Sequence, residues 1–318
     1  MKRRDFIQNN AKMLVSAPFI NFQLNSRIWD MNKELYKCKI GTFECTIFKD
    51  FMFKYKTKDY FINAGKIELE ESLSKYKLLS DDIPSPYISM LLQDGDRKIL
   101  IDSGIGFSEE PIIFRDKKFI LKGQLAHLLK RERVNSNEIT DVIITHFHPD
   151  HIGGVFSSDN QLAFPNATFH LHQKEWDYWH SSKADSQPPL FKYFIKNNIT
   201  PLEKENINFI KDDYQELSTD IIAVNASGHT EGQIALMIGN KNDRLLYISD
   251  AFLHPLHIEK LDWQTNYDLD HKKAKNTRMK LLDLAFEENM RVNAFHFDFP
   301  GIGLVQKENN SWKWVYGK

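Results

Sequence analysis

The stretch THFHPDHIGG, at residues 145–154, limits more than any other how this chain can fold and act. It follows the apolar run DVIIT, which is typical of a buried strand. The side chains from His146 to His151 therefore occupy a loop at the carboxyl end of a strand, where binding residues commonly gather. Imidazole nitrogens and carboxylate oxygens are ligands that suit zinc. The stretch therefore predicts a metal site.

The spacing within this loop predicts two metal positions. Alternate residues of a tight turn can point the same way, so His146 and His148 can share one metal. Asp150 and His151 then face a second position nearby. A lone His-x-His pair is common by chance, so the metal hypothesis makes a further demand: more ligands must follow later strands.

Three later residues meet this demand. His229 follows an apolar run that ends at Ala226, Asp250 follows the run LLYIS, and His296 lies within NAFHF. Histidines and acids therefore recur where predicted strands end, which favours a metal centre over isolated structural histidines.

Five motifs, ILIDSG, THFHPDH, SGHTEG, SDA and the final His296, resemble in content and order those of the metallo-β-lactamase superfamily. The resemblance covers roughly residues 38–318. It implies an α+β fold, a four-layer αββα sandwich with two divalent metal ions at one edge. The implied ligands are His146, His148 and His229 for one metal, Asp150, His151 and His296 for the other, and a bridging Asp250.

The resemblance also gives a role to Asp102, in ILIDSG, which would accept a hydrogen bond from a ligating imidazole and fix its tautomer. Zinc is the expected occupant of both positions. Manganese, iron(II) or cobalt would also suit histidine and carboxylate ligands.

Within the superfamily, the chain resembles methyl parathion hydrolase and its relatives most, and then the N-acyl homoserine lactonases. The stretches that carry this likeness are PNATFHLHQKEWDYW, LDWQTNYDLDHKKAKNTRMKLLDLA and FHFDFPGIG. Asp298 departs from the proline that relatives tend to carry. The likeness implies a dinuclear hydrolase in which a metal-bridging hydroxide attacks a small, largely apolar ester, lactone or phosphotriester. Asp150 and Asp250 are the expected catalytic carboxylates, and Asp150 is a candidate to carry the proton of the leaving group.

Other reactions stay open at this point. A β-lactam or thioester hydrolase would use the same fold, as would a di-iron oxidoreductase, although the latter typically has a glutamate where His148 stands. Phe107, Phe252 and Phe297 flank the ligand motifs and are the expected wall of an apolar pocket. The cations Lys260 and Arg244 have no clear place at the site, which argues against an anionic substrate.

Composition excludes several classes of partner. The chain has 42 Lys and Arg against 43 Asp and Glu, so there is no electrostatic case for nucleic acid. No apolar run approaches the roughly 18 residues of a membrane-spanning helix. We expect a small-molecule substrate and allow for a homodimer. Cys38 and Cys45 could pair, but two small apolar thiols are the preferred interpretation.

The N-terminus carries a second signal. Arg3 and Arg4, in KRRDFI, resemble a twin-arginine export signal and precede a short apolar stretch at residues 13–20. Lys12 interrupts the approach to this stretch, so the alternative is a basic tail without an export role. We expect an exported or periplasmic protein, and otherwise a cytoplasmic one. Residues 1–35 are taken as this N-terminal segment and residues 36–318 as one hydrolase domain.

Hydrophobic patterns predict the main elements. Expected strands cover residues 39–48, 87–92, 98–102, 141–145, 168–171, 221–226, 234–238, 244–249 and 294–297. Helices are expected over GQLAHLLKRERV, closing at Asn135, and over HKKAKNTRMKLLDLAFEENM, with Met279, Leu282 and Phe286 in the core. Residues 183–213 are expected to form a long loop or a helical insertion over the site.

Several further side chains have a structural and a functional interpretation. His170 and His172 are expected to be structural, since they alternate on a predicted strand. One of His254 and His257 is a candidate for the pocket wall because both closely follow Asp250. The aromatic side chains expected to pack on a helix, with a chance of lining a cleft, are Trp176, Tyr178 and Trp179.

Overall fold

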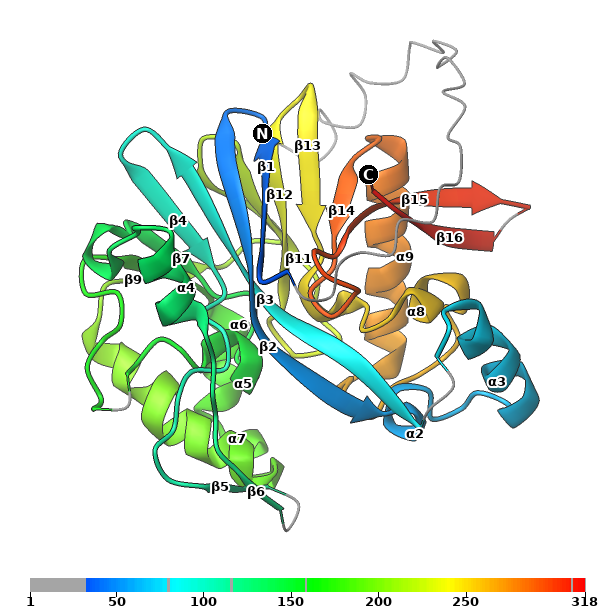
Figure 1. Ribbon diagram of the computed structural model, residues 1–318, viewed down its shortest axis with the longest axis horizontal. Helices are drawn as coiled ribbons and strands as arrows, with labels where there is room; N and C mark the ends of the chain where they lie inside the picture. Colours follow the sequence, from blue (N-terminus) through cyan, green and yellow to red (C-terminus); the bar gives the residue numbers. More distant parts are fainter. Residues whose placement is uncertain (1–32, 79–80, 115–116, 158, 310, 318) are drawn as a thin grey trace.

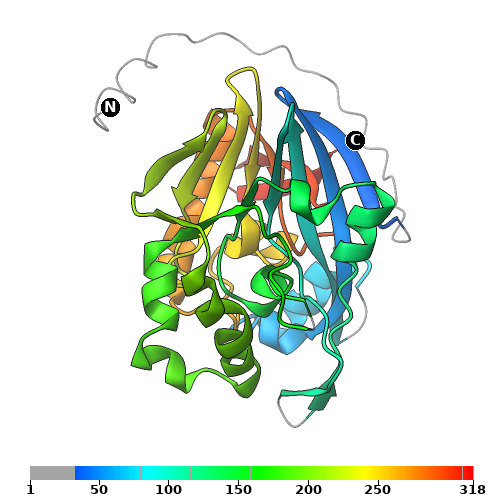
Figure 2. The ribbon, with the colours of Figure 1, turned by 90° about the vertical axis from the view of Figure 1, so that its left-hand side faces the viewer.

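A computed structural model describes residues 33–78, 81–114, 117–157, 159–309 and 311–317. Two mixed sheets pack face to face and helices cover their outer faces (Figures 1 and 2). This arrangement confirms the α+β class and the four-layer αββα sandwich that the resemblance implied. The proposed export signal, with Arg3 and Arg4, lies outside the described residues.

Over the residues that the structure describes, each sheet of the sandwich has seven strands. In spatial order, the first contains β1 (Leu35–Ile40), β2 (Phe43–Lys56), β3 (Asp82–Asp94), β4 (Arg97–Ile101), β7 (Asp141–Ile143), β8 (Thr168–His172) and β9 (Ile207–Ile210). The second contains β10 (Tyr214–Ser218), β11 (Ile221–Asn225), β12 (Ile234–Asn240), β13 (Asp243–Tyr247), β14 (Arg291–Asn293), β15 (Ile302–Glu308) and β16 (Ser311–Tyr316). A separate hairpin consists of β5 (Ile112–Phe114) and β6 (Lys117–Phe119).

Helices of very different length connect and cover the sheets. The α-helices are α2 (Thr57–Tyr60), α3 (Lys66–Lys75), α4 (Leu125–Arg131), α5 (Pro149–Ile152), α6 (Gln173–Trp179), α7 (Pro189–Phe194), α8 (Pro255–Glu259) and α9 (His271–Glu287). Short 3-10 or π turns are η1 (Ser136–Glu138), η2 (Ser182–Ser186), η3 (Ile195–Ile199), η4 (Thr200–Lys204) and η5 (Ser249–Ala251). The long helix α9 lies against the second sheet (Figure 1).

The strand β12 shows how the sequence builds these layers. Successive side chains of a strand point to opposite faces. Leu236 and Ile238 accordingly join the core between the two sheets, whereas Ala235 and Met237 join the layer beneath α9. Because both faces are buried, the strand is an unbroken apolar run rather than an alternating one.

Two parallel strand pairs create the functional edge of the sandwich. β4 pairs with β7 in the first sheet and β13 pairs with β14 in the second, and both pairs are parallel. Parallel strands end at the same edge of a sheet. Asp102 and the HFHPDH loop therefore follow one pair, and Asp250 and His296 follow the other.

Some expected elements differ from the observed ones. The run at residues 39–48 is two strands, because Gly41 takes φ +57 and turns the chain between them. The expected strand at residues 294–297 was wrong: β14 ends at Asn293, and residues 294–297 lie in the irregular segment that follows it. A short buried apolar run does not by itself identify a strand. Helix α4 ends at Arg131, and Asn135 instead caps the η1 turn.

The apolar stripe of α9 was also misassigned. Leu282 is buried as predicted, but Met279 and Phe286 are 42% and 49% exposed. The buried face is instead centred on Ala274, Arg278 and Leu281. Residues 183–213 do contain a largely helical insertion, which ends in β9.

Two remaining sequence questions have direct answers. Cys38 and Cys45 face each other across β1 and β2 and are free thiols. Among the residues that the structure describes, no helix combines the length and the apolar composition that a membrane crossing needs.

Candidate metal centre

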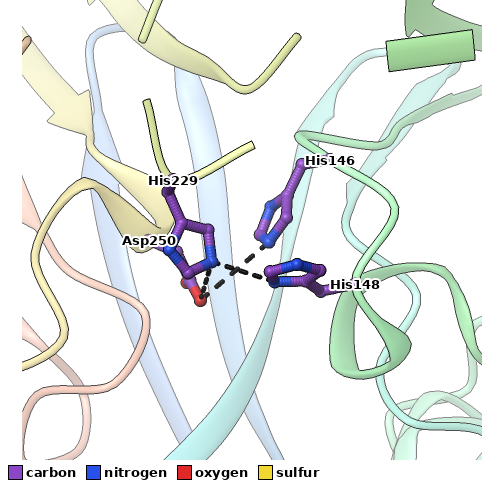
Figure 3. Close-up of side chains that lie close together, drawn as sticks. All are labelled: His146, His148, His229 and Asp250. Atoms are coloured by element: carbon purple, nitrogen blue, oxygen red, sulfur yellow. Dashed lines mark hydrogen bonds and ion pairs between the residues drawn. The ribbon is translucent and has the colours of Figure 1, made fainter. Parts of the chain in front are cut away.

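The structure brings all seven predicted ligands together in two groups. The first group is His146, His148, His229 and Asp250, and the second is Asp150, His151, Asp250 and His296. Within each group, one ligand atom from every residue lies within 4.8 Å of the others. Figure 3 shows the first group: dashed lines join His146 and His229 to the Asp250 carboxylate, and a third joins His148 to His229.

Asp250 is the residue that joins the groups. Its Oδ2 lies 3.5 Å from His229 Nε2 and 3.0 Å from His296 Nε2. Its Oδ1 lies 3.2 Å from His151 Nε2. One carboxylate therefore reaches imidazoles of both groups, which is the geometry that a bridging ligand needs.

The short helix α5 presents two of the ligands. Pro149 occupies its first turn, where its fixed φ suits a helix start, and Asp150 and His151 follow at once. Gly153 ends the helix against the loop that carries Asp102. A Cβ at Gly153 would stand 2.5 Å from the carbonyl carbon of Ile105, so only glycine permits this approach.

Asp102 supports the loop from beneath. Its Oδ2 lies 2.9 Å from His151 Nδ1 and accepts a hydrogen bond from Tyr247 Oη at 2.8 Å. Its Oδ1 accepts a hydrogen bond from the backbone N–H of Thr145 at 2.8 Å. Asp102 itself has φ +56, a strained conformation for a non-glycine residue that this network of partners maintains.

Sequence reasoning missed two further buried acids. Glu175, in α6, accepts hydrogen bonds from the backbone N–H of Phe147 and from Thr230 Oγ1, so it ties the first ligand loop to the loop of His229. Asp268 lies 3.2 Å from His229 Nδ1 through its Oδ1. A glutamate among the aromatic residues of QKEWDYW was a usable signal for a buried acid, whereas the loop around Asp268 has no comparable pattern.

The donor set fits divalent metal ions. His146 Nε2 and Asp150 Oδ2 are buried and have no hydrogen-bond partner among the described residues. Such buried orphan atoms are rare in proteins. Burial also holds the pKa of His146 well below its usual value, so the imidazole is neutral, which is the form that ligates a metal.

A cavity of about 270 Å³ opens beside Asp150, Asp250 and His296. Its wall is mainly aromatic and aliphatic. The aromatic side chains are Phe51, Phe53, Tyr55, Tyr60, Tyr87, Phe191 and Tyr267, and the aliphatic ones are Ile105, Ile120, Leu121, Leu190 and Leu253.

The three phenylalanines expected in this wall are not there. Phe252 and Phe297 are buried beneath α9 on the other side of the second sheet, and Phe107 is 51% exposed outside the cavity. Phe297 directly follows His296, and Phe252 follows Asp250 across the η5 turn, yet both pack in the layer beneath α9, so proximity to a motif was a poor guide to side-chain direction.

The cation argument also needs correction. Lys54, Lys56 and Lys122 line the cavity, although Lys260 and Arg244 do not. Lys56 pairs with Asp82. Lys54 and Lys122 are exposed and form no ion pair with any described residue.

Four of the other histidines have structural roles. His170 bonds Asp141, and His172 accepts a hydrogen bond from the backbone N–H of Lys174. Neither His254 nor His257 lines the cavity: the first caps α8 and the second bonds the carbonyl oxygen of Tyr60. Burial lowers the pKa of both to about 3.

Aromatic residues of α6 support the wall of the cavity and line a second, smaller hollow. Trp179 stacks on Phe191, a residue of the cavity wall, with ring centroids 5.6 Å apart. Tyr178 and Trp179 line a second, smaller hollow of about 200 Å³, which also borders His148 and His229. Trp176 packs instead on Phe147 and Phe209.

An αββα sandwich with two His/Asp groups sharing one aspartate defines the class of this protein. Residues 84–291, more than half of the chain, match the family model of the metallo-beta-lactamase superfamily, and the chain belongs to this superfamily. No curated protein sequence matches the chain.

Solved structures with the same fold span almost the whole chain. AidC, a dizinc quorum-quenching lactonase in complex with an N-hexanoyl-L-homoserine product, is 25% identical, with a TM-score of 0.76 over 89% of this chain and 97% of its own. The hydrolase AbOPH in the β-lactamase superfamily is 24% identical, with a TM-score of 0.78 over 90% and 98%. A probable metal-dependent hydrolase from Staphylococcus aureus is 17% identical, with a TM-score of 0.71 over 88% and 99%.

Proposed function

We propose that this chain is a dinuclear metal-dependent hydrolase that cleaves a small, largely apolar ester, lactone or phosphotriester. The observation that carries the proposal is the position of Asp250, which both ligand groups share at the wall of an aromatic cavity. Two divalent ions, zinc by expectation, would lower the pKa of water there and polarise a carbonyl or phosphoryl oxygen. The similarity to the dizinc lactonase AidC supports the proposal.

The ligands divide between the ions by group. His146, His148 and His229 would hold one ion, Asp150, His151 and His296 would hold the other, and Asp250 would contact both. Asp150 faces the cavity, and its Oδ2 lies 3.5 Å from His296 Nε2. We assign the Asp150 carboxylate oxygen that does not hold the ion to accept a proton from the attacking water and to return it to the departing alcohol oxygen.

Two phenols in the cavity wall give the site a neutral hydrogen-bond donor. Tyr55 Oη and Tyr87 Oη lie 2.7 Å apart, so one hydroxyl proton is used between them. The other has no acceptor among the described residues and is available to a substrate oxygen. Burial raises the pKa of both phenols, so both keep their protons. The rings also pack edge-on against His296, which places the pair beside the second ligand group.

The cavity wall selects for apolar groups. An aryl or acyl group that buries on the order of 100 Å² of apolar surface gains about 2.5 kcal/mol. Lys54 and Lys122 are at the cavity and admit an anionic group at its rim. The aromatic interior of the cavity therefore favours neutral substrates, and Lys54 and Lys122 reduce this preference by admitting an anionic group.

The test is a comparison of kcat/KM for a neutral aryl ester, a neutral lactone, a phosphotriester and an anionic β-lactam, each with zinc, manganese or cobalt. We expect the neutral esters to be preferred and the Asp250→Ala variant, prepared identically, to lack the activity. A tenfold preference for the β-lactam, about 1.4 kcal/mol in the transition state, would contradict the proposed substrate class. Purification with iron and flavin would instead indicate an oxidoreductase.

A further inference from the structure

Arg278, in the middle of α9, is only 1% exposed, although it carries a positive charge. Its Nη2 donates to Asp268 Oδ2 at 2.7 Å, and its Nε donates to the carbonyl oxygen of Ala251 at 2.6 Å. Removing both charges of such a pair from water costs several kcal/mol per ion, so a buried ion pair is weak evidence for stability. The contacts of this pair indicate another role.

The first contact leads to the ligand His229. While Asp268 Oδ2 binds Arg278, Asp268 Oδ1 lies 3.2 Å from His229 Nδ1. A proton on His229 Nδ1 therefore has an acceptor, which leaves the lone pair on Nε2, the atom 2.9 Å from His148 Nδ1. Backbone bonds from Leu269 N to His229 O and from Asp270 N to Gly228 O hold the two loops together.

The second contact leads to the bridging residue. Ala251 directly follows Asp250, so the bond from Arg278 Nε fixes the peptide beside the shared carboxylate. One guanidinium therefore connects two ligand-bearing segments of the second sheet. No local pattern in the sequence joins these segments.

The second ligand group has a different support. His151 relies on Asp102, whose partners are Thr145 and Tyr247, both neutral residues. Asp102 and Asp268 thus each hold one imidazole, in separate groups, and only Asp268 has an arginine.

We propose that Arg278 and Asp268 are positioning residues for the His146, His148 and His229 group, and that this pair controls the affinity of one metal ion independently of the other. The inference rests on the proposed dinuclear function. Loss of the hydrogen-bond partner of a metal-binding histidine typically lowers metal affinity about 10–100-fold. The loss here falls on one ion of two.

The experiment is a zinc titration of chelator-treated protein against a competing chromophoric chelator, for wild type, Asp268→Asn and Arg278→Lys. Asp102→Asn is the matched variant for the other group, and Lys275→Gln, which removes a surface charge from the same helix, is the control. We expect Asp268→Asn to bind one zinc as tightly as wild type and the second about 10–100-fold more weakly. Arg278→Lys, which keeps the charge but not both bonds, should show a smaller change of the same kind.

Location of the retained zinc decides the assignment. In crystals of Asp268→Asn grown with one equivalent of zinc, the ion should lie at Asp150, His151 and His296; in Asp102→Asn it should lie at the histidine group. Two zinc sites of wild-type affinity in both Asp268→Asn and Arg278→Lys, or loss of the wrong ion, would overturn the proposal. A merely structural pair would lower Tm in EDTA without separating the two affinities, which also overturns it.

If one variant fails to fold, the zinc titration of the other still tests the proposal. Asp268→Asn preserves side-chain size and Arg278→Lys preserves charge, so the two variants perturb folding in different ways. Wild-type protein that binds no divalent metal would refute the proposed function itself. The two failures are therefore distinguishable in one titration.

Discussion

Gly153→Ala is the substitution that most directly perturbs the packing on which the ligand loop depends. Gly153 has φ −64 and ψ −28, values that alanine adopts easily, so the backbone of the variant is not strained. The added Cβ would stand 2.5 Å from the carbonyl carbon of Ile105. Ordinary carbon–carbon contacts are about 3.5–4.0 Å, so the two segments must separate by about 1 Å.

That separation acts on both sides of the second ligand group. Helix α5 carries Asp150 and His151, and the loop before Ile105 carries Asp102, which bonds His151. Overpacking of this kind costs about 1–3 kcal/mol, or roughly 2–4 °C of Tm for each kcal/mol. A displacement of about 1 Å at reacting groups can reduce kcat/KM about 100-fold.

The assay combines thermal unfolding, zinc content and kcat/KM on the best neutral ester. Gly65→Ala is the control for an added methyl group, because a Cβ at Gly65 meets nothing within 4 Å. Gly65 is the N-cap of α3, so we expect a loss of up to about 1 kcal/mol of stability there, with zinc content and kcat/KM unchanged. Wild-type activity and zinc content in Gly153→Ala would refute the argument that this contact holds the ligands in place.

Three further variants test other parts of the site. Asp250→Ala should abolish activity and lose at least one metal ion, because the carboxylate that both ligand groups share is gone. Elemental analysis and kinetics measure the two effects. Full metal content with wild-type turnover would disprove that Asp250 serves both ions. Tyr87→Phe should lower kcat/KM about 2–13-fold and leave the zinc content unchanged. This factor corresponds to the loss of one neutral hydrogen bond, about 0.5–1.5 kcal/mol. An unaltered kcat/KM would show that the phenol pair does not bind the substrate oxygen. Replacing Lys54 and Lys122 together by alanine should raise KM for an anionic ester and leave KM for a neutral ester unchanged. Equal effects on the two KM values would show that the lysines act only on stability.

The residues of the candidate metal centre could be predicted from the sequence because they follow apolar runs at predicted strand ends and because their motifs resemble those of a known superfamily. His146 and Asp250 come directly after buried strands, and their meeting follows from the parallel pairing of β4 with β7 and of β13 with β14. Metal chemistry then restricts which side chains can cooperate at one edge. Local pattern, ligand type and the family resemblance together predicted which side chains the structure gathers at this edge.

The cavity wall could not be found in the same way, because side-chain direction depends on the whole fold. Phe252 lies two positions after Asp250 yet packs beneath α9. Tyr55 and Tyr87 lie far from Asp250 in the sequence, on β2 and β3, yet they line the cavity. Asp268 reaches His229 across 39 residues of sequence. Such contacts arise from tertiary packing, which periodicity does not encode.

The most direct test of the central claim is anomalous diffraction at the zinc edge from crystals of wild-type protein grown with zinc. The account predicts two peaks for each chain, about 3.5–4 Å apart, one at His146, His148 and His229, the other at Asp150, His151 and His296, with Asp250 in contact with both. A single peak, or peaks remote from Asp250, would contradict a dinuclear centre.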